Sequence, residues 1–184
     1  MKTKDYLIVA LAPFALLWIP FVGVMTSSEW KWSPSDFLLF WFVLAGAAYV
    51  YRLLATRRWA NLAYRLGAGL AVVTGFLLTW VSLAVQIIGD ENPGNVFYLG
   101  VILLGLIGVG VSRFQPAALA KVALTMAASL FVIPLVSVMF WPADFSPGFE
   151  KILVLNGFFV AMFAAAGLFF RHAAKQTSAR PVAA

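Results

Sequence analysis

The sequence has no cysteine, only one histidine and few charged residues, and each shortage excludes a kind of chemistry. Without cysteine there is no disulfide, no thiolate nucleophile, no iron–sulfur cluster and no cysteine-ligated zinc. The histidine, His172, lies close to Arg171 and Lys175, which is typical of a solvated residue and not of a general base. No paired carboxylates interrupt the apolar runs. The sequence therefore predicts no catalytic site, no enzyme and no bound cofactor other than the cation considered below.

Apolar side chains dominate the sequence. They make up 63% of the 184 residues, charged residues make up 11%, and the mean hydropathy is +0.94. A soluble helix keeps a polar face for water, whereas the long runs here are apolar all round. The sequence therefore predicts an integral membrane protein whose solvent is a lipid bilayer.

Six apolar runs approach or reach the length of about 20 residues that crosses a bilayer core. They cover residues 6–25, 37–54, 66–88, 96–111, 117–140 and 152–170. The first run holds Pro13 and Pro20 and lacks a small-x-small cleavage site, so we interpret it as a retained span and not as a signal peptide. The expected fold class is all-α, a polytopic bundle of six transmembrane helices forming three helical hairpins. We expect one domain over residues 1–172 and a short basic tail over 173–184.

The stretch 86–95 is the one dense polar break in the apolar middle of the chain. Gly89, Pro93 and Gly94 predict a reversal here, because glycine admits positive φ and proline removes a backbone donor. A second local signal lies earlier, where Ser33 is placed to cap a helix that has Pro34 in its first turn and Asp36 near its positive end. Glycines in the fourth run predict close approach of another helix; they are Gly100, Gly105, Gly108 and Gly110.

Basic residues gather in alternate connections. Only Lys31 and Lys151 fall on one side of the expected membrane, and the other eleven of the thirteen fall on the side that holds both termini. Basic loops are retained in the cytoplasm, so we expect both termini there and Asp90 outside. The net charge of +6 follows from this topology, and we do not expect nucleic acid as a partner. The eleven residues are Lys2, Lys4, Arg52, Arg57, Arg58, Arg65, Arg113, Lys121, Arg171, Lys175 and Arg180.

Several segments stand out by their residue order: 32–37 (Trp-Ser-Pro-Ser-Asp-Phe), 61–65 (Asn-Leu-Ala-Tyr-Arg), 76–80, 87–95 (Ile-Ile-Gly-Asp-Glu-Asn-Pro-Gly-Asn) and 113–116 (Arg-Phe-Gln-Pro). Together they resemble a group of small multi-pass bacterial inner-membrane proteins of unassigned function. The resemblance covers about residues 32–171, and its most distinctive part is the Gly-acid-Glu-Asn-Pro-x-Asn loop. It implies a bacterial cytoplasmic (inner) membrane and a multi-pass topology, and it implies no activity.

Oxygen ligands gather in the same loop. Asp90, Glu91, Asn92 and Asn95 offer side-chain oxygens, and calcium takes about six to eight such ligands. One hypothesis is therefore a divalent cation, calcium or magnesium, bound at this loop. The alternative is that Asp90 and Asn92 form an Asx-type turn and Asn95 caps the following helix. A wider outer-face cluster of Asp36, Asp144 and Glu150 requires the three outer loops to pack together.

No ionisable group lies near the middle of a predicted span, where such groups usually mark transport or catalysis. We therefore expect a non-enzymatic membrane component that binds a partner protein, a lipid or a second copy of itself through its outer face. Most tryptophans gather at that face; they are Trp18, Trp30, Trp32, Trp41, Trp80 and Trp141. The alternative is a small-solute or ion transporter or channel with an acidic periplasmic vestibule and a polar path along Thr74, Thr79 and Gln86.

Overall fold

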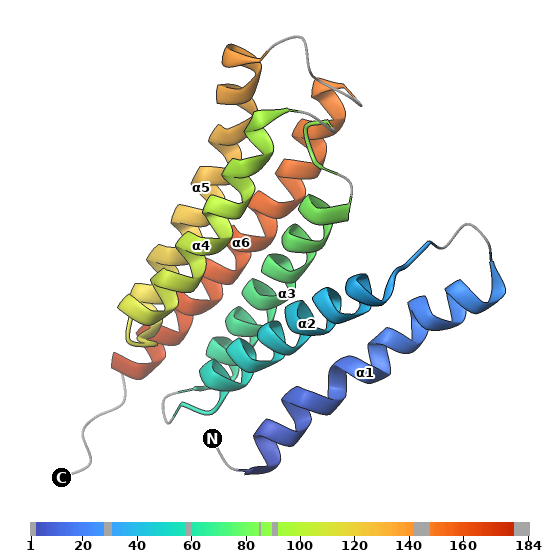
Figure 1. Ribbon diagram of the computed structural model, residues 1–184. Coiled ribbons are helices and arrows are strands. Elements are labelled where there is room, and N and C mark those ends of the chain that lie inside the picture. Colours follow the sequence, from blue (N-terminus) through green and yellow to red (C-terminus); the bar gives the residue numbers. More distant parts are fainter. Residues whose placement is uncertain are drawn as a thin grey trace. The chain divides into compact units, whose positions relative to one another are not determined.

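The computed structural model describes residues 3–27, 31–57, 60–84, 86–89, 92–141 and 148–178. These residues form six α-helices and one short 3-10 helix, and no strand is found among them (Figure 1). All six α-helices are long and apolar enough to cross a membrane, which is consistent with a multi-pass membrane protein. The predicted all-α class with six spans is confirmed. The elements are α1 (Thr3–Thr26), α2 (Pro34–Ala55), α3 (Leu62–Ala84), η1 (Pro93–Asn95), α4 (Val96–Val111), α5 (Pro116–Phe140) and α6 (Phe149–Ser178).

Two helices, α3 and α6, end several residues away from the predicted bounds. We expected the third span to run to residue 88, but α3 ends at Ala84, and Gln86 has a φ of 51°. The next two residues, Ile87 and Ile88, are buried in a turn, so their apolar character reflects burial and not helix. At the other end of the chain, α6 runs to Ser178 and includes half of the predicted tail. The first tail residue, Ala173, is fully buried, so the helix still packs against its neighbours there.

The chain divides into two compact units, which we describe separately: unit 1, Met1–Thr56, and unit 2, Arg57–Ala184. In unit 1, α1 and α2 pack as an antiparallel pair. Asp5 near the start of α1 forms an ion pair of 2.9 Å with Arg52 near the end of α2. The predicted cap of α2 is confirmed, because the Asp36 backbone N–H donates to Ser33 Oγ at 3.3 Å and Asp36 Oδ2 accepts from the Ser33 N–H at 2.7 Å.

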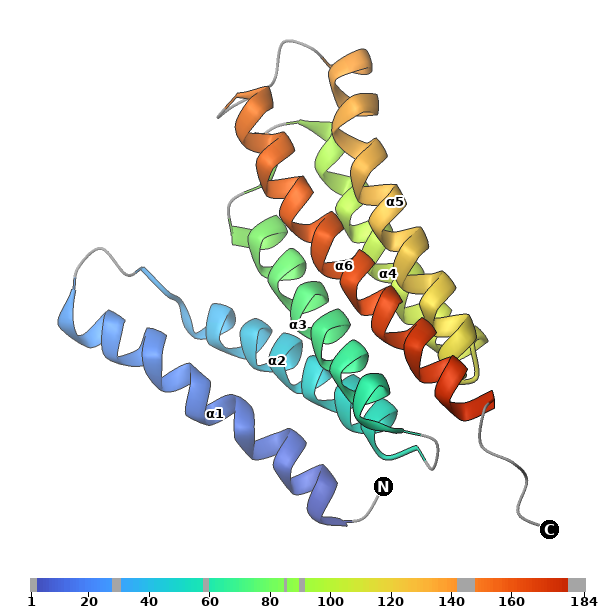
Figure 2. The same ribbon diagram turned by 180° about the vertical axis from the view of Figure 1, so that it is seen from behind.

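In unit 2, α6 lies between α3 and α5, and α4 packs mainly against α5 (Figure 2). The core consists of large apolar side chains such as Leu78, Leu130, Phe159 and Phe163, each at most 1% exposed. α3 approaches α6 closely at Gly67, where an added Cβ would lie 3.1 Å from the Ala166 carbonyl oxygen.

The glycines of α4 divide into two pairs. Gly105 faces Met126 and Gly108 faces Val122, both on α5, so these two glycines permit the expected close helix approach. Gly100 and Gly110 have no neighbouring atom within 4 Å of an added Cβ among the described residues. Only half of the glycines that the sequence singled out therefore serve this packing.

Candidate functional site

The loop between α3 and α4 is held together by its two described asparagines. Asn92 Oδ1 accepts from the Gly94 N–H at 2.8 Å, which is the Asx-type turn that we predicted for this residue. Asn95 Oδ1 accepts from the Ile88 N–H at 3.1 Å, and Asn95 Nδ2 donates to the Gly89 carbonyl at 2.7 Å. The predicted cap of the fourth span by Asn95 is wrong, because its side chain makes no capping bond to α4 and is used within the loop.

Gly94 brings this loop against α5. An added Cβ at Gly94 would collide with Ser137 Oγ and would lie 2.9 Å from Asn92 Oδ1. Its φ is not in the left-handed region, so glycine is required here for close contact and not for backbone conformation. Ser137 is fully buried, and among the described residues its hydroxyl has no hydrogen-bond partner.

The residues proposed for a cation are only partly described. Asp90, Glu91 and Asp144 lie outside the described residues. Asn92 and Asn95 direct their amide oxygens toward backbone N–H groups of their own loop. Asp36 lies in unit 1, where it takes part in the cap of α2, and Glu150 lies in the first turn of α6 in unit 2. Within the described ranges no group of three His, Cys, Asp or Glu side chains is placed to hold a metal.

The two threonines of the hypothetical polar path bond within their own helix. Thr74 is buried and its hydroxyl donates to the Leu70 carbonyl at 2.6 Å, one turn back in α3. Thr79 likewise donates to the Gly75 carbonyl at 2.7 Å. Gln86 lies beyond the end of α3 and is exposed. Both hydroxyls are thus satisfied by their own helix, which is the ordinary arrangement of threonine in an apolar span.

A buried polar pair joins α4 to α6. Tyr98 is fully buried and Asn156 is 2% exposed, and Asn156 Nδ2 donates to the Tyr98 hydroxyl at 2.9 Å. The same Nδ2 also donates to the Ile152 carbonyl at 2.9 Å. Sequence reasoning did not select Tyr98, although tyrosine inside an apolar run is a residue that needs a partner for its hydroxyl. The pair is a contact between two helices of unit 2 and contributes to their packing.

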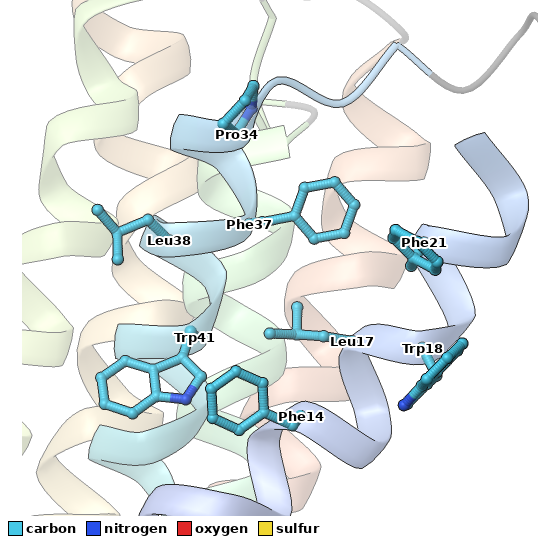
Figure 3. Close-up of a pocket in the computed structure, with 8 residues that line it drawn as sticks. All are labelled: Phe14, Leu17, Trp18, Phe21, Pro34, Phe37, Leu38 and Trp41. Carbon is cyan, nitrogen blue, oxygen red and sulfur yellow. The ribbon is translucent and has the colours of Figure 1, made fainter. Parts of the chain in front are cut away.

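An apolar cleft lies in unit 1, between α1 and α2 (Figure 3). It has a volume of about 690 Å³, and all eight residues that line it are apolar or aromatic. Four come from α1 and four from α2, and each set follows the spacing i, i+3, i+4, i+7 of a single helix face. We call this the aromatic cleft; its residues are Phe14, Leu17, Trp18, Phe21, Pro34, Phe37, Leu38 and Trp41.

Aromatic contacts define the shape of this cleft. Leu17 points from α1 toward α2 and is 8% exposed, while Phe14 and Trp41 lie side by side with ring centroids 6.1 Å apart (Figure 3). The indole N–H of Trp41 donates to the Ala10 carbonyl at 3.3 Å. Above them, Phe21 and Phe37 have ring centroids 6.5 Å apart. The cleft is therefore lined by aromatic rings and aliphatic side chains.

Small residues, which let helices approach closely in membranes, are missing from the described lining of the cleft. A second groove in unit 2, of about 490 Å³ between α4 and α5, differs in this respect, since Gly100, Ala128 and Ser129 are among the residues that line it. The two grooves thus differ in the kind of surface they offer to an apolar neighbour.

No model of a known protein family matches the chain, and searches of the curated proteins and of the solved structures found no match either.

Proposed function

We propose that this protein is a non-enzymatic membrane component that binds a lipid by holding one of its acyl chains in the aromatic cleft of unit 1. The observation that carries the proposal is the composition of the cleft, which has about 690 Å³ of space and only apolar and aromatic residues around it. A molecule that fills such a space should have no hydrogen-bonding groups in it, because the lining offers no partner for them. An acyl chain meets this condition.

An acyl chain fits the cleft better than a transmembrane helix of a partner. Helices associate in a bilayer through small residues that bring their backbones close, whereas Phe14, Trp18, Phe37 and Trp41 keep an incoming backbone at a distance. A flexible hydrocarbon chain instead packs between ring faces. Phe14 is 54% exposed and Trp18 is 62% exposed, so the cleft is open to the surrounding lipid.

A basic residue near the cleft in the sequence matches the negative charge of the lipid's phosphate. Lys31 is exposed and lies three residues before Pro34, the first residue of α2 and part of the cleft. An ammonium group at that level suits the phosphate of a phospholipid. With the basic ends of the spans in the cytoplasm, as the charge distribution favours, the cleft opens to the outer leaflet of a bacterial inner membrane.

Native mass spectrometry of the full chain, purified in a mild detergent, tests this function. We expect the double variant Phe14→Ala with Phe37→Ala to retain one phospholipid fewer than the wild type. The matched control is Ile19→Ala, because Ile19 also lies on α1, is 66% exposed and does not line the cleft. An equal number of retained phospholipids in the double variant and in the Ile19→Ala control would contradict a site in the cleft.

A further inference from the structure

One end of unit 2 is strongly basic. At the end where α3 and α5 begin and α4 and α6 finish (Figure 1), the described chain carries six basic side chains. The sequence has no Asp or Glu in residues 57–65, 112–121 or 171–178, so no carboxylate of these segments neutralises them. The six are Arg57, Arg65, Arg113, Lys121, Arg171 and Lys175.

One of these side chains is held in place by an aromatic ring. The guanidinium carbon of Arg57 lies 3.7 Å from the centroid of the Phe114 ring, which is a cation–π contact. The ring belongs to a residue that is itself fixed, because the Tyr64 hydroxyl donates to the Phe114 carbonyl at 2.9 Å. The Nε of Arg57 is buried and finds no hydrogen-bond partner among the described residues. Arg57 is thus oriented by an aromatic ring, and no ion pair to it is found in the part of the chain that the structure describes.

The turn that carries Phe114 is strained. Arg113 has a φ of 47° and Phe114 a φ of 65°, and two consecutive left-handed residues that are not glycine cost about 1 kcal/mol or more each. Ser112 supports the turn, since its Oγ donates to the Val109 carbonyl at 2.8 Å and accepts from the Phe114 N–H at 3.2 Å. The strained turn places Phe114 beneath Arg57 and leaves the preceding residue, Arg113, exposed.

We propose that Arg57 and Arg113 form a phosphate-binding site, with Phe114 and Tyr64 as positioning residues, and that its ligand is the headgroup of an anionic phospholipid. A guanidinium group presents paired N–H donors that match two phosphate oxygens. Basic residues at a membrane surface attract anionic lipids, and the surrounding cations of this end add to that attraction. This site lies in unit 2 and does not depend on the aromatic cleft of unit 1.

Lipid titration of the full-length protein in detergent, followed by native mass spectrometry and by the melting temperature, tests the site. The titration uses the Phe14→Ala, Phe37→Ala protein, in which the aromatic cleft is disabled. In this protein we expect phosphatidylglycerol to bind and to raise the melting temperature, and phosphatidylcholine to do neither. Arg57→Gln is expected to weaken phosphatidylglycerol binding about tenfold. Phe114→Leu keeps every charge and is expected to weaken binding as well, because the guanidinium is no longer held.

The matched control is Lys121→Gln, which removes one charge from the same end of unit 2 outside the site. Equal weakening by Lys121→Gln and Arg57→Gln would mean diffuse attraction and would overturn the proposal. So would equal binding of phosphatidylglycerol and phosphatidylcholine by the protein whose aromatic cleft is disabled. Inorganic phosphate is the second ligand tested: a rise in melting temperature that Arg57→Gln abolishes supports the phosphate site and identifies a soluble ligand in place of a lipid. If Arg57→Gln fails to fold, phosphatidylglycerol binding by Phe114→Leu and Arg113→Gln tests the site instead, and unchanged binding by both variants would overturn the proposal.

Discussion

The hydroxyl of Tyr98 on α4 accepts a hydrogen bond of 2.9 Å from the side-chain nitrogen of Asn156 on α6. Both residues lie inside apolar spans, and both are almost completely buried. An unpaired polar group in such a place costs free energy, because hydrocarbon offers no hydrogen-bond partner. The pair therefore fixes the register of α4 against α6.

A double-mutant cycle measures this contact. We expect Tyr98→Phe and Asn156→Leu each to lower the stability of the protein in detergent, and the double variant to be less destabilised than the two losses added together. The coupling energy should be about 1 kcal/mol, as for other hydrogen bonds between membrane helices. A coupling energy near zero would show that the two side chains do not depend on each other.

The crossing of α3 and α6 depends on the absence of a side chain at Gly67. An alanine Cβ there would lie 3.1 Å from both the Ala166 carbonyl oxygen and Phe169 Cβ, and neither atom is at the end of a flexible chain. We expect Gly67→Ala to lower stability by about 1–3 kcal/mol. Gly75→Ala in the same helix meets no atom within 4 Å and should leave the melting temperature unchanged or raise it. The opposite order of the two variants would contradict the close crossing.

Ser137 sets the space available to Gly94. We expect Gly94→Ala to destabilise the protein, because its Cβ would displace the loop from α5. Ser137→Ala should be neutral or stabilising, since the hydroxyl is buried without a partner among the described residues. In the double variant the alanine at 94 no longer meets the Ser137 hydroxyl, its nearest neighbour, so part of the lost melting temperature should return. If the two effects simply add, the collision is not with Ser137.

The loop between α3 and α4 should not need a metal for its shape. Asn95→Asp keeps an acceptor for the Ile88 N–H but places a carboxylate against the Gly89 carbonyl, so we expect a lower melting temperature. We expect this loss to be the same with calcium, with magnesium and with a chelator. A wild-type melting temperature that rises with calcium, and a variant that does not respond, would support the cation hypothesis for Asp90 and Glu91.

Helix starts were predictable where the sequence carries specific backbone signals. Ser33 and Pro34 mark the start of α2, and the structure has a complete capping box there. Helix ends inside apolar sequence were not predictable: Ile87 and Ile88 look like the continuation of a span, yet they are buried in the turn that follows α3. A high hydropathy indicates only that a side chain is apolar, and it does not distinguish a helix from a buried turn.

The candidate sites show the same limit. The spacing of Phe14, Leu17, Trp18 and Phe21 is visible in the sequence, but a helix that is apolar all round does not reveal which face meets its neighbour. The contact of Tyr98 with Asn156 joins residues 58 positions apart, and no local pattern indicates it. The alternation of basic and apolar segments, by contrast, is a pattern of the sequence itself, so the six spans could be predicted without knowledge of any tertiary contact.

Photo-cross-linking from within the aromatic cleft tests the proposed function most directly. Phe21 lines the cleft and is 42% exposed, whereas Phe42 on α2 is 60% exposed and does not line it. A benzophenone amino acid is placed at each position in turn, and the protein is irradiated after purification in detergent. We expect a phospholipid adduct at position 21 and only detergent adducts at position 42. Equal lipid labelling of the two positions, or no lipid at position 21, would contradict an acyl chain held in the cleft.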